Sequence, residues 1–234
     1  MTTPAPLWLF DLDNTLHNAS HAIFPAIHRN MNRYIAQVLG QESGVALADA
    51  DTVNAAREKY WKRYGATLLG MIKHHAVRAE DFLREAHDFE DLAAMIRAER
   101  GLIRLLQGLP GRKILLTNAP RHYARKVTRQ LGLHRHFDRH ISIESMVVHR
   151  QLRPKPSRLL LRKLLAREGA AARRCILVED TVDNLKAAKA VGLQTVWVTG
   201  YLPLAVQQIK RPPYIDVKVK SVLQLPRQLH RLRG

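Results

Sequence analysis

Cysteine is almost absent from this chain, because Cys175 is the only one among 234 residues. A single thiol forms no disulfide within the chain, so we expect a reducing cytoplasm to be its location. Long apolar runs are missing too. None approaches the roughly 20 residues that a membrane span needs, and Met1 to Pro6 are too short for a secretory signal. The sequence therefore predicts a cytoplasmic protein with no membrane partner.

Acidic residues are few: 20 Asp and Glu against 38 Lys and Arg leave a formal net charge of +18. This balance is compatible with nucleic-acid binding or with an enzyme that attracts anionic substrates. The basic residues are spread along the chain, and no aromatic residues alternate with them as in a stacking surface. No helix-turn-helix or zinc-finger spacing is present. We therefore interpret the charge as a solvated basic surface and expect no nucleic-acid partner.

Short apolar runs predict buried strands at Leu7 to Phe10, Lys113 to Leu116, Cys175 to Val178 and Gln194 to Val198, with a fifth candidate at Ile141 to Ile143. Segments of helical period separate the later runs. Strands that alternate with helices indicate an α/β fold, in which a parallel sheet carries helices on both faces. Polar residues follow these strands at their carboxyl ends, where such sheets bind ligands.

The segment from Ser20 to about Arg100 has no convincing strand and several helical patterns. Its first pattern ends at Gly40, which we interpret as a stop signal. Further helices are expected over 51–64 and 79–89. We interpret the segment as a helical lid inserted after the first strand. Near the end of the chain, a short alternating run and a final basic helix are expected.

Acids, a hydroxyl and a lysine follow the predicted strands. Each alone has an ordinary structural explanation, such as a helix cap, a turn or a surface lysine. Together, each at the end of a predicted strand or just before a helix, they indicate one chemical site. The residues are Asp11 and Asp13, Thr117-Asn118, Lys155 between two prolines, and Glu179-Asp180 with Asn184 just beyond.

These residues resemble the motifs of the haloacid-dehalogenase-like (HAD) phosphohydrolase superfamily. Its Asp-x-Asp-x-Thr motif is matched by Asp11 to Thr15, its strand-end Ser or Thr by Thr117, its Lys by Lys155, and its acidic pair by Glu179-Asp180. The resemblance implies a Rossmann-like parallel-sheet core (HAD fold) formed by residues 1–18 and 101–234. It also implies that residues 19–100 form an inserted α-helical cap domain.

The resemblance implies a Mg²⁺-dependent phosphoric monoester hydrolase. Asp11 would attack phosphorus and form an aspartyl-phosphate, and Asp13 would act as general acid and base. Mg²⁺ would be held by the Asp11 carboxylate, the Asp13 backbone carbonyl and the Asp180 carboxylate. Phosphoryl oxygens would be held by Thr117, the Asn118 backbone N–H and Lys155. Glu179 and Asn184 are expected to support these groups from behind.

The helical segment is similar to the cap of pyrimidine 5'-nucleotidase-type proteins. The similar stretches are Asn30 to Tyr34, Tyr64 to Gly70, His74-His75 and His87-Asp88, together with Leu116 to Ala119 followed by His122, Ala124 and Arg125. Glu179 departs from that group, which more often has Asp there. This similarity implies a small phosphate ester, a pyrimidine nucleotide such as UMP or CMP, as substrate. The cap residues expected to contact it are Asn30, Tyr34, Tyr64, Thr67, His74 and His75.

Two other functions stay open. A phosphatase or phosphomutase for sugar phosphates or other small phosphate esters would use cap cations, and the sequence offers Arg57, Lys59, Lys62 and Arg63. A basic nucleic-acid-binding protein on a phosphatase fold is the alternative of another class. The intact Asp11, Asp13, Lys155 and Asp180 count against it. Asp13 also argues against the halide-removing relatives, which need only the first aspartate.

Overall fold

The protein is described by a computed structural model that covers residues 5–232. A parallel sheet of six strands in the order β3-β2-β1-β6-β7-β8 forms its centre. The strands are β1 (Leu7–Phe10), β2 (Arg112–Leu116), β3 (Arg139–Ile141), β6 (Cys175–Glu179), β7 (Gln194–Val198) and β8 (Val217–Val219). The prediction of an α/β fold with a parallel sheet is confirmed.

Strand β1 lies in the middle of the sheet because all four of its residues are apolar and buried. Leu7 and Leu9 join the core under helices α8 (Arg158–Glu168) and α9 (Val182–Val191). Trp8 and Phe10 point to the opposite face, where their rings stack at 5.9 Å. A central parallel strand is covered on both faces, so it reads as a continuous apolar run rather than an alternating one.

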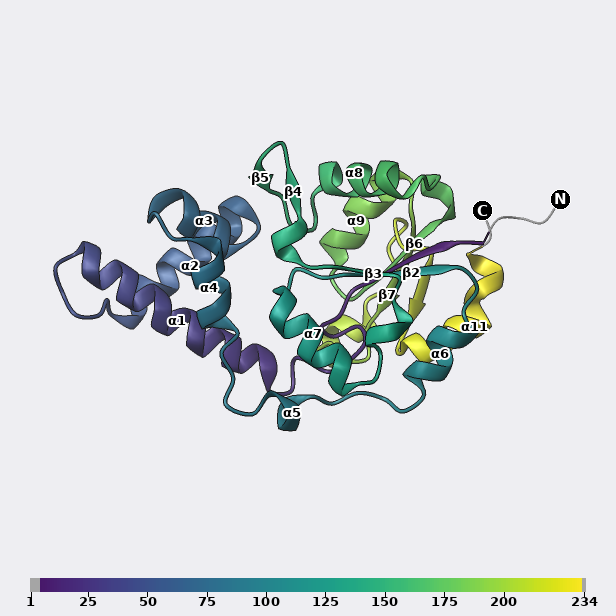
Figure 1. Ribbon diagram of the computed structural model, residues 1–234, viewed down its shortest axis with the longest axis horizontal. Helices are drawn as coiled ribbons and strands as arrows, with labels where there is room; N and C mark the ends of the chain where they lie inside the picture. The colour runs from purple at the N-terminus through teal and green to yellow at the C-terminus, as the bar shows by residue number, and fades with distance from the viewer. Residues whose placement is uncertain (1–4, 233–234) are drawn as a thin grey trace. The chain divides into compact units, whose positions relative to one another are not determined.

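Helices cover both faces of the sheet (Figure 1). Helices α8 and α9 lie on one face, and α6 (Leu102–Gly108), α7 (Arg121–Gln130) and α11 (Leu225–Gln228) lie on the other. Strand β1 pairs with β2 on one side and with β6 on the other. Strands β2 and β3 are therefore added on one side of β1, and β6 to β8 are added on its other side. Open α/β sheets form their binding crevice at the carboxyl ends of the strands where the strand order reverses in this way.

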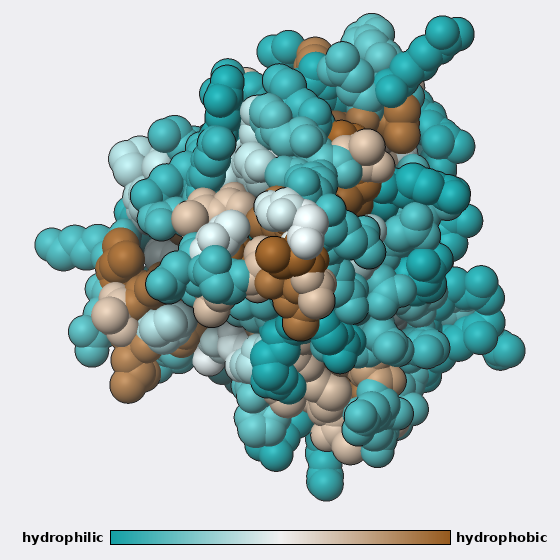
Figure 2. Space-filling model, turned by 90° about the vertical axis from the view of Figure 1, so that its left-hand side faces the viewer, coloured by the Kyte–Doolittle hydropathy of each residue, from teal (hydrophilic) through white to brown (hydrophobic). Residues whose placement is uncertain are grey.

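The chain divides into two compact units. One holds residues 1–21 and 93–234 and contains the sheet, and the other holds residues 22–92. We call the second the helical unit. Its helices are α1 (Ile23–Glu42), α2 (Ala50–Tyr64), α3 (Thr67–His74) and α4 (Ala79–Ala86), and the short α5 (Leu92–Met95) follows. The face of the molecule in Figure 2 is largely hydrophilic with scattered apolar patches. Val45, Leu47 and Trp61 are exposed apolar residues of the helical unit.

Gly40 does not end the first helix, which continues to Glu42, so this prediction is wrong. A Cβ atom on Gly40 would lie 2.8 Å from the Cα of Leu47. The glycine therefore allows the chain after α1 to pass close against the helix. This tertiary contact, and not a helix end, explains why glycine stands at position 40.

Three other details differ from the sequence-based expectation. The strand expected at Ile141 to Ile143 ends at Ile141, and a 3₁₀ turn follows. The final basic helix is short, with α11 followed by a single 3₁₀ turn. A small antiparallel hairpin, β4 (Val147–Val148) and β5 (Gln151–Leu152), was not expected. Its turn residues His149 and Arg150 have positive φ angles without being glycine or asparagine, so no usual turn signal marks it.

Within residues 5–232, no helix is both long and apolar enough to cross a membrane.

Candidate active site

The loop after β1 is compact because the chain turns sharply at Asn14. The φ angle of Asn14 is 55°, in the left-handed region that Asn tolerates better than most residues. Its side chain bonds the backbone N–H and the hydroxyl of Ser20, which fixes the turn. Thr15 then donates its hydroxyl to Asp11 Oδ2 at 3.3 Å. The turn holds Asp11 at the carboxyl end of the sheet.

Lys155 reaches the same place from a distant part of the chain. Its Nζ donates to Asp11 Oδ1 at 2.7 Å and to Glu179 Oε2 at 2.6 Å. The Lys155 side chain is 2% exposed, so both ion pairs are nearly free of water. The ammonium group of Lys155 thus joins the carboxylates at the ends of β1 and β6, which are adjacent parallel strands.

Burial dominates the electrostatics of this cluster. It raises the pKa of Asp11 to about 7, aided by the charge of Glu179 and opposed by that of Lys155. Burial also raises the pKa of Glu179 to about 7 and that of Asp180 to about 6. For Lys155, burial acts to lower the pKa, but the charges of Asp11 and Glu179 outweigh it and raise the pKa above its ordinary value. More negative charge is gathered here than one lysine neutralises.

The donor set fits a hard divalent cation. Single carboxylate oxygens of Asp11, Glu179 and Asp180 all lie within 4.8 Å of one another. Asp11 and Glu179 are 6% and 1% exposed, and Asp180 is half-buried. Carboxylate oxygens alone, with no sulfur or imidazole among them, are the ligands that Mg²⁺ prefers. A cation here would also relieve the repulsion between the three acids.

Asp180 is held through its backbone as well. The indole N–H of Trp197, a fully buried residue of β7, donates to the Asp180 carbonyl oxygen at 2.9 Å. Thr181 donates its hydroxyl to Asp180 Oδ1 at 3.1 Å.

The remaining core residues expected at the site follow β2 or lie in α9, and Asn118 among them contacts Lys155. Thr117 is buried at the end of β2, and its Oγ1 accepts from the Ala119 N–H at 3.0 Å. The side chain of Asn118 bonds both the N–H and the C=O of Lys155. Asn184 is 8% exposed in the first turn of α9. The structure thus brings Asn118 to Lys155, and the sequence did not indicate that the Asn118 side chain would hold the Lys155 backbone.

Two residues near Asp13 escaped the sequence analysis. Tyr123 in α7 donates its hydroxyl to Asp13 Oδ1 at 2.5 Å, and His17 Nε2 lies 2.9 Å from the same oxygen. Burial, the charge of Asp13 and this hydrogen bond raise the pKa of Tyr123 well above its ordinary value, so the phenol keeps its proton. Only His17 could have been suspected from the sequence as a neighbour of Asp13, because it follows Asp13 by four residues.

Five of the six residues expected to contact substrate in the helical unit contact other residues of that unit. Tyr64 and His74 are joined by a 2.6 Å hydrogen bond, and His75 bonds Tyr60 and Glu42. The Asn30 amide donates to the backbone of Asp88 at 2.6 Å, and the ring of Tyr34 packs edge-on against Phe82.

A hollow of about 490 Å³ lies within the helical unit, between α1, α2 and the start of α3. Thr67 lines it, and the other five residues expected to contact substrate do not. Arg57, one of the cations that the sequence offers for a second phosphate, lines it too. His28 and Trp61 are lining residues that the sequence analysis did not single out.

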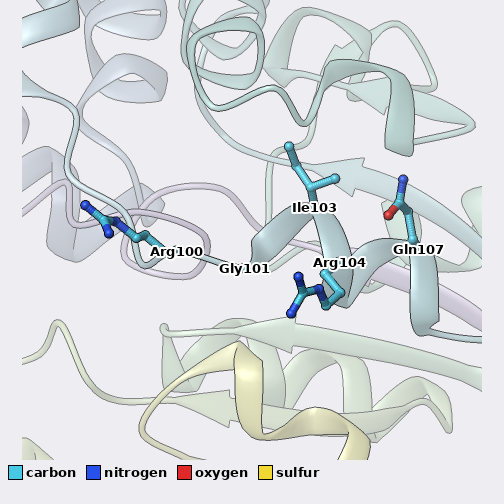
Figure 3. A pocket seen from close by; sticks show the side chains of 5 residues that line it. All are labelled: Arg100, Gly101, Ile103, Arg104 and Gln107. Atoms are coloured by element: carbon cyan, nitrogen blue, oxygen red, sulfur yellow. The ribbon is translucent and has the colours of Figure 1, made fainter.

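Another hollow, of about 540 Å³, lies at the start of α6 in the unit that contains the sheet (Figure 3). Its lining residues are Arg100, Gly101, Ile103, Arg104 and Gln107. This lining offers no carboxylate, imidazole, thiol or hydroxyl group that could serve as nucleophile or base. This hollow therefore adds no candidate catalytic group to those at the ends of β1 and β6.

A comparison with protein families finds the model of the haloacid dehalogenase-like hydrolases over residues 7–192. Among curated proteins, Phosphate metabolism protein 8 of Saccharomyces cerevisiae is 23% identical over 205 residues. That alignment covers 80% of this chain and 59% of the yeast protein, so the chain spans less than two thirds of that relative.

Solved structures share the fold over nearly the whole chain. A HAD phosphatase from Thermococcus onnurineus superposes with a TM-score of 0.62 at 16% identity, covering 96% of this chain and 97% of that one. The magnesium-bound protein YfnB from Bacillus subtilis gives 0.59 at 15% identity, over 97% and 99% of the two chains. A 2-haloacid dehalogenase from Pseudomonas syringae gives 0.59 at 18% identity, over 98% and 100%. Phosphatase and dehalogenase structures match with similar TM-scores, 0.62 and 0.59, so the choice of reaction rests on individual residues.

Proposed function

The chain belongs to the haloacid dehalogenase-like hydrolase family, and from that premise we propose that it is a Mg²⁺-dependent phosphomonoester hydrolase that works through an aspartyl-phosphate on Asp11. The observation that carries the proposal is the cluster in which Asp11, Glu179 and Asp180 gather around Lys155 at the carboxyl edge of the sheet. A second acid, Asp13, lies two residues after Asp11 in the same loop. A dehalogenase reaction has no use for that second acid, because a halide leaves without a proton.

Asp11 is the nucleophile in this proposal. Its carboxylate oxygen attacks phosphorus as the bond from phosphorus to the leaving oxygen breaks. The obstacle is charge, since two unit charges about 4 Å apart repel by about 4 kcal/mol at an effective dielectric near 20, and a phosphate dianion doubles this. Lys155 Nζ, 2.7 Å from Asp11 Oδ1, supplies a fixed positive charge against that repulsion.

Asp11, Asp180 and the Asp13 backbone carbonyl would hold Mg²⁺, and Glu179, which lies within the same cluster, would support them. When bound, the cation neutralises charge on the phosphoryl oxygens and orients them for attack. Trp197 contributes by fixing the backbone of Asp180.

Asp13 moves the protons. It gives a proton to the leaving oxygen in the first half of the reaction and takes one from the attacking water in the second. Thr117 and the Asn118 backbone N–H would hold the phosphoryl oxygens, as donors that face the charge developing on them.

The substrate that we propose is a pyrimidine nucleoside 5'-monophosphate, UMP or CMP. This finer proposal rests on the sequence of the helical unit, where Tyr60, Tyr64, His74 and His75 form one aromatic cluster. Aromatic faces and hydrogen-bonding ring groups are suited to a flat base with carbonyl and ring-nitrogen groups. A site that hydrogen-bonds a polar group rejects ligands that lack it, whereas apolar pockets discriminate weakly.

Sugar phosphates are the second candidate substrate class, and Arg57 is the observation that favours them. It lines the hollow of the helical unit, whereas Lys62 is paired with Glu58 at 2.5 Å. Lys59 and Arg63 lie over the rings of Tyr60 and Tyr64. Arg57 is therefore the cation that would bind the second phosphate group of a sugar bisphosphate. A cytoplasmic location is also part of the proposal, and the single, buried Cys175 is what supports it.

The test is the value of kcat/KM for UMP, CMP, AMP, GMP and a hexose phosphate, each with and without Mg²⁺. We expect UMP and CMP to lead and all activity to need the cation. A lead of about tenfold or more for a purine nucleotide or the hexose phosphate, a difference of roughly 1.4 kcal/mol, would remove the pyrimidine proposal and leave the phosphatase. No turnover of any phosphate monoester, with salt-sensitive binding to DNA or RNA instead, would remove the phosphatase as well.

A further inference from the structure

One oxygen of Asp13 is held from two directions by buried side chains. Tyr123, in the first turn of α7, donates its O–H to Asp13 Oδ1 at 2.5 Å across 110 residues of chain. His17 Nε2 lies 2.9 Å from the same oxygen. Tyr123 and His17 are both 0% exposed, and the side chain of Asp13 is 14% exposed. These contacts hold the carboxyl group in one orientation.

An ionised Asp13 accepts the hydrogen bond that Tyr123 donates, and the buried phenol fixes where this carboxyl oxygen lies. A proton transfer is efficient only when the acid is held in the right orientation toward the reacting atom. The contact with Tyr123 supplies such a hold from a distant helix.

We propose that Tyr123 is a positioning residue that fixes the orientation of the Asp13 carboxyl group and thereby aims its proton transfer at the leaving group. This inference rests on the proposed function, in which Asp13 is the general acid and base. In the first step, an Asp11 oxygen bonds to phosphorus, the bond from phosphorus to the leaving oxygen breaks, and the proton of Asp13 passes to that oxygen. In the second step, a water oxygen bonds to phosphorus, the acyl-phosphate bond from phosphorus to Asp11 breaks, and a proton of the water returns to Asp13.

A purely structural role would give Tyr123 only its ring, which fills space in the core. Tyr123→Phe separates the two roles because it keeps the ring and removes the hydroxyl. Thr128→Val is the matched control. Thr128 is a fully buried residue of the same helix whose hydroxyl donates to the Ala124 carbonyl at 2.7 Å, away from Asp13. Both variants remove one buried hydroxyl from α7, and only the first touches the proposed acid.

The experiment measures kcat/KM for a series of aryl phosphates of graded leaving-group pKa, and for UMP, with wild type, Tyr123→Phe and Thr128→Val. Because kcat/KM reports on the steps up to the first irreversible one, it isolates departure of the leaving group. Tyr123→Phe should lose about tenfold to a hundredfold on poor leaving groups, part of the 10² to 10⁴ that positioned proton transfer supplies. For leaving groups that depart without a proton, Tyr123→Phe should keep the wild-type kcat/KM. The kcat/KM of Thr128→Val relative to wild type should not depend on the pKa of the leaving group.

An equal loss across all leaving groups, or no loss at all, would overturn the inference and leave the proposed phosphatase standing. Thermal unfolding of both variants shows whether a uniform loss comes with lost stability, which identifies a structural role. Wild-type protein that hydrolyses none of the substrates would overturn the proposed function together with the inference.

Discussion

The side-chain amide of Asn118 holds the backbone of Lys155 on both sides: its Nδ2 donates to the Lys155 carbonyl oxygen at 3.0 Å, and its Oδ1 accepts from the Lys155 N–H at 2.9 Å. Asn118 follows β2, and Lys155 precedes α8. One amide thus joins two loops that meet at the site, and it sets where the Lys155 ammonium group can reach.

Asn118→Ala tests this link. The Asn118 backbone N–H, which we assign to phosphate, stays in place, so only the hold on Lys155 is lost. Two hydrogen bonds at about 1 kcal/mol each predict a loss of about 2 kcal/mol in the free energy of unfolding. We expect kcat/KM to fall as well, because Lys155 is less well placed. Urea unfolding and kinetics on an aryl phosphate measure the two effects, and unchanged values for both would show that Lys155 needs no such support.

Asp11→Asn should abolish turnover, because an amide is not a nucleophile toward phosphorus. The change removes one of the two carboxylates that Lys155 contacts, and Glu179 remains at 2.6 Å to pair with it. We therefore expect the variant to keep its fold, as circular dichroism can check. Hydrolysis of a generic aryl phosphate at a rate near that of wild type would contradict the proposed mechanism.

Asp13→Asn should lower the rate by about 10² to 10⁴, the usual contribution of positioned proton transfer. The loss in kcat/KM should shrink for substrates with very good leaving groups, which need no proton in the first step. Dephosphorylation also needs a base, so kcat is expected to stay low throughout. If Asp13→Asn hydrolysed a substrate with a poor leaving group at the wild-type rate, Asp13 would not be the general acid.

Removal of metal should stop activity, and Mg²⁺ should restore it, because the acids at the ends of β1 and β6 offer only hard oxygen ligands. Treatment with EDTA followed by titration with Mg²⁺ is the measurement. Full activity after exhaustive chelation would contradict the assignment.

The effect of Mg²⁺ on stability should depend on pH. Since burial raises the pKa of Asp11 to about 7 and that of Asp180 to about 6, the metal-free folded state binds more protons than the unfolded state below about pH 7. Its stability therefore falls as the pH rises from the ordinary carboxyl range through these values. Mg²⁺ must displace the same protons, so its stabilising effect should be larger at about pH 8 than at about pH 5.5.

Thermal unfolding with and without Mg²⁺ at the two pH values measures this difference. Asp180→Asn is the control, because it removes one ligand and should shrink the Mg²⁺-induced rise in Tm at the higher pH. An equal rise at both pH values would show that the cation binds elsewhere.

Gly40→Ala should destabilise the protein although alanine favours helices. Its Cβ would lie 2.8 Å from the Leu47 Cα, so backbone must move, and overpacking of this kind costs about 1 to 3 kcal/mol. Gly108→Ala in α6 is the control, because its Cβ would meet nothing within 4 Å. The control should be neutral or stabilising by up to about 1 kcal/mol. Urea unfolding distinguishes the two, and a stabilised Gly40→Ala variant would contradict the close approach seen here.

Local patterns in the sequence determined the framework. The apolar runs at Leu7 to Phe10 and Cys175 to Val178 became adjacent central strands, because a run apolar at every position is stable only where both faces are covered. The acids that follow those runs predicted where the chemistry lies, since parallel strands place their carboxyl ends at one edge. The helices of the insert could also be predicted from the sequence, because the spacing of apolar residues that indicates a helix involves only residues close together in the chain.

Tertiary structure alone decided which atoms contact one another within the site that the motifs predicted. Asp11 contacts Lys155 across 144 residues, and Asp13 contacts Tyr123 across 110, and no local pattern encodes such a distance. Gly40 looked like a helix stop because its real constraint, the passing backbone of Leu47, belongs to another segment. Propensity and periodicity act over a few residues, whereas the partner of a buried polar group is set by the folded chain, which must satisfy every such group at once.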